Sequence, residues 1–193
     1  YSQDALCELM QSHPFLFPDF EAPSLPFTPA HPPFARAGAP FVDPWGCVWE
    51  TSDDGIVGVV TKHPLASWDD FDAYEPPDPN RFTHWGPIDW NALENDARPI
   101  GLPRGDIGHG HTFLKLTDIR GYENVLFDMA DNEPRLLKLI DMIEAFNAGL
   151  VRNYVERAGV EVIGFAEDLG MQVGPMLSPE HFRKYIKPSY QRL

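Results

Sequence analysis

The order of elements predicted between residues 132 and 188 constrains the fold more than any other feature of the sequence. The stretch NEPRLLKLIDMIEAFNAGLVRNYVERAG carries apolar side chains at the spacing of one helix face. Asn132 can cap this helix, Pro134 suits its first turn, and Gly159 ends it. We therefore predict one long amphipathic helix, whose apolar stripe consists of Leu136, Ile140, Ile143, Leu150, Tyr154 and Ala158.

A short apolar run, residues 160–165, follows this helix. Nearly continuous β-branched runs of this kind are typical of strands buried on both faces of a parallel sheet. Glu167 and Asp168 come directly after the run, and Ser178 begins a further helix that Pro188 should kink or end. Helix, strand, acidic loop and helix in this order predict a parallel α/β fold. Function in such folds gathers at the C-terminal ends of the strands, so the two carboxylates are candidate site residues.

Proline, of which the sequence has 20, limits the regular secondary structure that the first half of the chain can form. Residues 1–44 are too rich in proline for long regular elements, and too rich in Phe and Leu for a free linker. We expect them to form an extended segment that its aromatic side chains pin to the core. Residues 45–193 are then expected to form the domain proper.

Shorter elements are predicted from local patterns. The expected helical segments are residues 2–12, 68–74 and 120–132. Arms 47–51 and 56–61 flank the turn sequence 52–55 and predict a β-hairpin within residues 46–61. Two further short strands are expected at residues 98–102 and 112–117.

The net charge and the cysteine content limit the classes of binding partner and the compartment that we expect for the chain. The net charge is −14, with 29 acidic against 15 basic residues, which disfavours a nucleic-acid binder and weighs against a highly anionic substrate. No apolar run reaches the length of a membrane span. Two thiols, Cys7 and Cys47, make no disulfide framework, and the first residues carry no signal-like pattern, so we expect a reducing cytoplasm.

Four motifs, in order, carry a resemblance to a known family. They are DPWGCVWE, HPLASWDDFDAYEPPDP, IRGYENVLFDMADNEPRLLKLIDMI and DLGMQVGPMLSPEHFRKYIKPSYQRL. Together they resemble the uroporphyrinogen decarboxylase-like superfamily over residues 40–193. That superfamily also includes corrinoid-dependent methyltransferases. Each motif alone is weak, but the ordered set is fairly specific.

The resemblance implies a (β/α)8 TIM barrel with its active site at the C-terminal mouth. A barrel of this kind usually needs about 250 residues. The chain therefore resembles the early strands of an incomplete barrel, with a Pro-rich N-terminal segment and a β-hairpin insertion. An open barrel would expose apolar edges, so we expect either self-association into a homo-oligomer or marginal stability.

Three functions remain open. The first, which we favour, is methyl transfer between a small methylated compound and a corrinoid or thiol acceptor, with a corrinoid protein as partner. In that branch the resemblance implies zinc held by a His-x-Cys pair and a later Cys, expected beyond Leu193, so no metal ligand is expected within this chain. The second is decarboxylation of uroporphyrinogen, whose arginine-rich N-terminal motif is not found here. The third is an inactive barrel fragment.

The resemblance places Glu167 at a strand tip that faces the substrate, where it would act as a general acid or base or as an oxygen ligand to a metal. Since neighbours on a strand point to opposite faces, one of Glu167 and Asp168 should face the pocket and the other should cap a helix or bond loop amides. Gln172, in the same segment, is a further expected substrate contact.

The remaining candidates each have two or more interpretations. His109 and His111 are a substrate contact, a metal site or a plain loop. Arg120 binds an anionic ligand or pairs with Asp118. Trp45, with Trp49, packs in the core, covers the pocket or stacks on the substrate.

Overall fold

The computed structural model describes residues 3–22, 30–94 and 104–193. These residues separate into two units, residues 1–32 and residues 33–193. The smaller unit contains helix α1, Gln3–Ser12, as the sequence predicts. The boundary between the two units lies within residues 1–44, the segment that the sequence predicts to pack on the domain. Residues 33–44 belong to the larger unit, where Phe34 lies against Trp85 with ring centroids 4.4 Å apart, and the packing of the first 32 residues stays a prediction.

Short elements open the larger unit. They are the 3-10 helix η1 (Pro33–Ala35), strands β1 (Phe41–Val42), β2 (Val48–Glu50) and β3 (Val59–Lys62), the 3-10 helix η2 (Trp68–Ala73), helix α2 (Trp90–Glu94) and strand β4 (Arg104–Asp106). The predicted hairpin is present as β2 and β3, which pair antiparallel, and β1 adds a third strand that the sequence did not indicate. The second arm begins at Val59 rather than at Ile56, because the chain first passes Gly58, where a Cβ would lie 2.0 Å from the Glu50 carbonyl oxygen.

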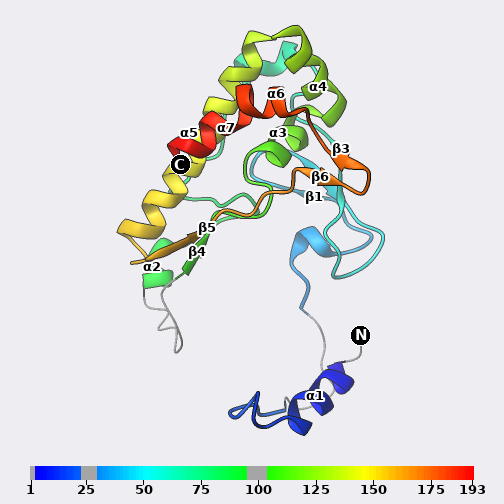
Figure 1. The fold of residues 1–193 in the computed structure, drawn as a ribbon, viewed down its shortest axis with the longest axis vertical. Coiled ribbons are helices and arrows are strands. Elements are labelled where there is room, and N and C mark those ends of the chain that lie inside the picture. The colour runs from blue at the N-terminus through cyan, green and yellow to red at the C-terminus, as the bar shows by residue number, and fades with distance from the viewer. Residues whose placement is uncertain (1–2, 23–29, 95–103) are drawn as a thin grey trace. The chain divides into compact units, whose positions relative to one another are not determined.

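Helices dominate the rest of the unit. They are α3 (Phe113–Arg120), α4 (Tyr122–Asp131), α5 (Pro134–Glu156), α6 (Pro179–His181), the π-helical turn η3 (Phe182–Ile186) and α7 (Lys187–Arg192), with strands β5 (Val162–Gly164), β6 (Gly170–Met171) and β7 (Gly174–Pro175) between α5 and α6. In Figure 1, α5 is the long yellow helix of the unit. It contacts α3, α4 and α7. Among the described residues no helix is both long and apolar enough to cross a bilayer.

The long helix agrees with its sequence pattern except at its ends. Leu136, Ile140, Ile143 and Leu150 are buried, as the apolar stripe requires. Asn132 does not cap α5. It ends α4 in the left-handed conformation, and Glu133 is the residue whose side chain accepts a hydrogen bond from the first turn of α5.

The predicted strand at residues 112–117 is wrong, because this segment is the helix α3. Phe113, Leu116 and Ile119 are fully buried, and their spacing of three residues fits a helix face better than the two-residue period of a strand. The predicted strand at residues 98–102 lies outside the described residues.

Strands β4 and β5 pair in parallel, so the expected helix–strand order produces the expected strand direction. Gly105 lets α5 approach the pair closely, since a Cβ there would lie 2.8 Å from the Tyr154 ring. The prediction that residues 160–165 are buried on both faces is wrong. Val162 and Phe165 are 38% and 47% exposed, and β4 is the strand that pairs with β5 among the described residues.

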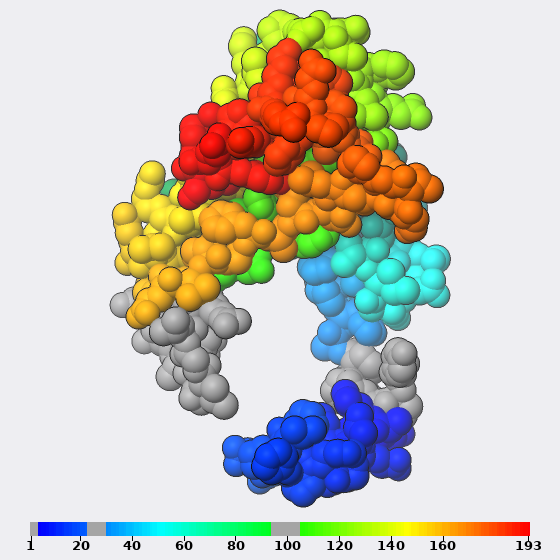
Figure 2. Space-filling model, viewed as in Figure 1, coloured from blue at the N-terminus to red at the C-terminus, as the bar shows by residue number. Residues whose placement is uncertain are grey.

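The described strands form one three-stranded and two two-stranded sheets. None of these sheets closes on itself, so the barrel architecture stays a prediction. The core lies between the hairpin and the helices α3, α4 and α5. Figure 2 shows the C-terminal residues, orange to red, lying across the visible face of the larger unit over the green residues of the α3 region.

Candidate functional site

Glu167, the predicted catalytic residue, lies after β5 and binds the start of α3. Its carboxylate accepts hydrogen bonds from the backbone N–H groups of Thr112, Phe113 and Leu114 at 3.0, 3.1 and 3.2 Å, and from the Tyr190 hydroxyl at 2.8 Å. The Thr112 side chain makes no cap hydrogen bond, so a carboxylate from a distant loop satisfies these helix N–H groups. These four bonds give Glu167 a structural role, and its catalytic role stays a prediction.

Asp168 and Gln172 lie in the segment that follows. Asp168 Oδ1 accepts a hydrogen bond from the backbone N–H of Gly170 at 3.0 Å, which matches the expectation that one of the two acids would bond loop amides. Gln172 is exposed in the turn between β6 and β7. Neither residue lines the two cavities described below.

The two histidines of the GHGH sequence lie in different surroundings. His111 is 2% exposed and lines a small cavity of about 170 Å³ together with Phe165, Glu167, Tyr190 and Leu193. Burial lowers the pKa of His111, while the Glu167 carboxylate opposes that change. His109 is exposed and lines a larger, separate pocket. The structure therefore does not bring the two imidazoles together as a ligand pair.

Arg120 is an internal ion-pair residue. Its Nε donates to Asp128 Oδ2 at 2.9 Å, one Nη donates to the carbonyl of Leu65 at 2.9 Å, and the guanidinium lies 4.5 Å from the centre of the Trp68 ring. The guanidinium is thus occupied by protein partners. This arrangement favours the ion-pair alternative over an anionic ligand, with Asp128 in place of the expected Asp118.

Trp45 begins a chain of hydrogen bonds through the core. Its indole N–H donates to His84 Nδ1 at 3.0 Å, so His84 carries its proton on Nε2 and donates to Asn147 Oδ1 at 2.8 Å. The Asn147 amide in turn donates to the His111 carbonyl at 2.9 Å. Trp45 is 1% exposed, which agrees with the alternative that it packs in the core. Burial, with a smaller effect of the Lys115 charge, lowers the pKa of His84 to about 3 and keeps the ring neutral.

A buried ion cluster lies beside this chain. Lys115, 3% exposed, lies 3.0 Å from Asp43 Oδ2 and 3.3 Å from Asp118 Oδ2. Burial disfavours the charge on Lys115, yet the two carboxylates outweigh burial and raise its pKa. Burial raises the pKa of Asp118, and Lys115 opposes that effect. Since Asp43 and Asp118 together carry one more charge than Lys115, the cluster is net negative when all three are ionised.

The hairpin is fixed to the other end of α3 by the backbone carbonyl of Asp118. This carbonyl accepts a hydrogen bond from His63 Nδ1 at 2.7 Å and from the Cys47 thiol at 3.4 Å. Helix-end carbonyls lack partners within their own helix, so these bonds satisfy a group that would otherwise be unpaired. Because a carbonyl only accepts, Nδ1 of His63 is the donor of this bond and carries a proton.

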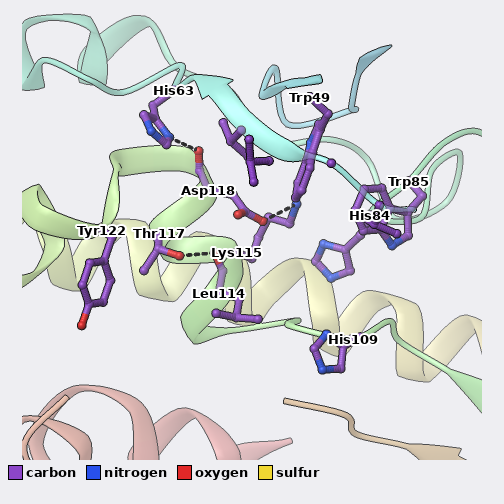
Figure 3. Close-up of a pocket in the computed structure, with 14 residues that line it drawn as sticks. Trp49, His63, His84, Trp85, His109, Leu114, Lys115, Thr117, Asp118 and Tyr122 are labelled. Carbon is purple, nitrogen blue, oxygen red and sulfur yellow. Dashed lines mark hydrogen bonds and ion pairs between the residues drawn. The ribbon is translucent and has the colours of Figure 1, made fainter. Parts of the chain in front are cut away.

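A pocket of about 480 Å³ opens between the hairpin and α3. Figure 3 shows His63, Asp118, Thr117 and Tyr122 to one side of it, and Trp85, His84 and His109 to the other. Its lining residues are Trp49, Val57, Gly58, Val59, Val60, His63, His84, Trp85, His109, Leu114, Lys115, Thr117, Asp118 and Tyr122. The volume lies within the range of small-molecule sites, and the walls are mostly apolar or aromatic.

Little in the sequence indicates this pocket. His63, Trp85 and the pair of Lys115 and Asp118 lie far apart along the chain, and the expected strand at residues 112–117 hides that one helix carries Lys115 and Asp118. The signals that were available are His109, an expected substrate contact, and Trp49, a possible pocket cover, and both line the pocket.

Zinc, which the resemblance implies, does not fit the described residues. Across residues 3–22, 30–94 and 104–193 no group of three His, Cys, Asp or Glu side chains is arranged to hold a metal ion. Cys47, the buried cysteine, has its pKa raised by burial and carries its proton, which is the wrong state for a metal ligand. We therefore assign no chemical step to a metal in this part of the chain.

No family model, curated protein or solved structure matches the chain.

Proposed function

We propose that the chain is part of a cytoplasmic enzyme of the uroporphyrinogen decarboxylase-like superfamily that transfers a methyl group from a small methylated compound to a corrinoid or thiol acceptor. The support for the superfamily is the ordered set of four motifs over residues 40–193. The parallel pairing of β4 with β5 across an intervening helical segment is consistent with the early part of a (β/α)8 barrel.

The pocket of Figure 3 is the observation that carries the proposal. It lies beside the loop that follows β4, because His109 of that loop lines it. C-terminal ends of parallel strands are the usual position of substrate sites in such folds. A volume of about 480 Å³ suits a small methylated molecule.

The charges of the pocket favour methyl transfer over porphyrinogen decarboxylation. Among the described residues that line the pocket, Lys115 is the single lysine and there is no arginine, and two carboxylates already neutralise Lys115. Arg120 is committed to Asp128 and to backbone carbonyls. A substrate with many carboxylates would therefore meet a net negative surface, which repels it.

A spectroscopic assay tests the proposal. The protein is incubated with reduced cobalamin and a panel of methyl ethers, methyl thioethers and methylamines, and methylation is followed by loss of the reduced cobalamin spectrum. When the chain is assayed within its full-length protein, we expect turnover with the wild type and at least a tenfold loss with Asp118→Asn. Asp72→Asn, which changes an exposed carboxylate in η2, is the matched control and should keep full activity.

Other outcomes would contradict the proposal in different ways. Release of CO₂ from uroporphyrinogen without added cofactor would establish the decarboxylase alternative. Neither reaction, together with a folded circular dichroism spectrum, would show that this chain is an inactive part of a barrel.

A further inference from the structure

The hydrogen bonds around the pocket fix which polar groups are left to face a ligand. Three potential donors are already used by protein partners. The Trp49 indole N–H donates to Asp43 at 3.0 Å, the His84 Nε2–H donates to Asn147 at 2.8 Å, and the Lys115 ammonium lies between its two carboxylates.

Two hydroxyl hydrogens are also committed. The Thr117 hydroxyl donates to the Leu114 carbonyl at 2.8 Å, and the Tyr122 hydroxyl donates to the Met176 carbonyl at 2.6 Å. Since carbonyl oxygens only accept, the direction of both bonds is certain, and each hydroxyl keeps lone pairs rather than a hydrogen for a further partner.

The Asp118 carboxylate is the charged group that remains for a ligand. Its partner among the described side chains is Lys115, and its side chain is 19% exposed. His63 lies beside it, with its Nδ1–H donated to the Asp118 carbonyl, and the Trp85 and His109 rings also line the pocket. The ion cluster to which Asp118 belongs is net negative when its three groups are ionised. A carboxylate backed by net negative charge is complementary to a ligand that is cationic and carries an N–H donor.

We propose that this pocket binds an organic ammonium ion that carries at least one N–H, attached to a flat or aromatic body of modest size. The N–H is held by the Asp118 carboxylate, and the body lies against the apolar and aromatic wall that includes Trp49, Val59 and Trp85. This inference rests on the proposed function for its chemical meaning, since the ligand is then the methyl donor, an N-methylated ammonium.

The methyl transfer balances without a proton donor. A bond forms between the methyl carbon and the nucleophilic acceptor as the C–N bond breaks, and the electron pair of that bond stays on nitrogen. The amine leaves neutral, because the ammonium already carried the positive charge. Asp118 therefore serves as a positioning carboxylate, and the engagement of Glu167 in capping α3 is no obstacle to the reaction.

Three probes of similar shape test the inference in the absence of any corrinoid. N-methylbenzylamine is a cation with N–H donors at neutral pH, benzyl methyl ether is its neutral counterpart without a donor, and phenylacetate is an anion. Binding is measured by titration calorimetry and by quenching of tryptophan fluorescence. We expect the amine to bind at least tenfold more tightly than the ether, which is the size expected for one charge-assisted hydrogen bond, and phenylacetate not to bind.

Two variants locate the site. Asp118→Asn should remove the preference for the amine over the ether, while the control Asp72→Asn should keep it. Val59→Trp fills the pocket from the hairpin, where Val59 is 69% exposed and lines the pocket, and should block binding of the amine and of the ether. This second variant remains informative if Asp118→Asn fails to fold.

Equal or tighter binding of the ether or of phenylacetate by the wild type would overturn the inference. It would also be overturned if the amine bound unchanged to folded Val59→Trp, since the amine site would then lie elsewhere. The two proposals fail separately. Selective amine binding without methyl transfer contradicts the proposed function alone, and methyl transfer from ethers without amine selectivity contradicts this inference alone.

Discussion

Four hydrogen-bond donors surround the Asp43 carboxylate, and its removal gives a sharp test of the buried ion cluster. Its side chain is fully buried. It accepts hydrogen bonds from the backbone N–H groups of Trp45 and Cys47, both at 2.9 Å, and from the Trp49 indole and the Lys115 ammonium, both at 3.0 Å. Asp43→Ala would leave all four donors without this acceptor.

The expected cost follows from the burial of the pair. Breaking a buried ion pair by removal of one partner costs about 3–5 kcal/mol, because the remaining charge stays buried without full compensation. Lys115 keeps Asp118 at 3.3 Å, so the lower half of this range is expected. A chain of this size loses about 2–4 °C of melting temperature per kcal/mol, so the melting temperature should fall by roughly 6–16 °C.

Urea unfolding measures the loss directly. Fluorescence of the tryptophans reports the core around Asp43, and far-ultraviolet circular dichroism reports the helices. Asp72→Ala, the same change at an exposed site, is the control and should alter the free energy of unfolding by less than about 0.5 kcal/mol. A loss below about 1 kcal/mol in Asp43→Ala, with the control unchanged, would show that the cluster is not formed in solution.

Two further predictions concern groups whose roles the sequence did not reveal. His84 has a folded pKa of about 3 against an ordinary 6.5, so its contribution to stability is present above pH 6.5 and is lost as the pH falls toward 3. His84→Gln can keep both hydrogen bonds and should flatten the fall of unfolding free energy between pH 6 and 4 by up to about 1.4 kcal/mol per pH unit. An unchanged slope in urea titrations at these pH values would refute this. Glu167→Ala removes the cap of α3 and should destabilise the protein by about 2 kcal/mol, and it should speed amide hydrogen exchange at Phe113 and Leu114. Tyr190→Phe removes one of the four hydrogen bonds to Glu167 and should cost about 1 kcal/mol. Equal effects of the two variants would contradict the capping role.

Elements with a strong local pattern could be predicted from the sequence. The helix α5 was expected because its apolar spacing persists over many turns, and Ser178 was recognised as a helix start, where its hydroxyl accepts from the His181 N–H. Pro188 was expected to disturb its helix, and the π-helical turn η3 directly precedes it. Pro188 has no N–H to donate to the preceding turn, which gives a physical reason for that widening.

The helix α3 could not be predicted because its support is not local. Its first N–H groups are satisfied by Glu167, and its Asp118 carbonyl by His63, which lie far away in the sequence. Residues 112–117 taken alone are short and apolar enough to suit a strand as well as a helix. Asp43 and Lys115, 72 positions apart, likewise show no pattern that links them before the chain folds. The pocket inherits this difficulty, since its lining comes from the hairpin, from the loop around Trp85 and from α3.

The hydrogen-bond chain from Trp45 to the His111 carbonyl runs in one direction only. It starts at an indole, which can only donate, and it ends at a carbonyl, which can only accept. Every side chain between them must therefore accept on one side and donate on the other, which His84 and Asn147 both do. An aspartate at position 147 could take the bond from His84 but could not pass one on to residue 111. A substitution at position 84 or 147 must therefore preserve the direction of these hydrogen bonds as well as the side-chain volume. It is tolerated only if the new side chain accepts from the residue before it in the chain of bonds and donates to the residue after it.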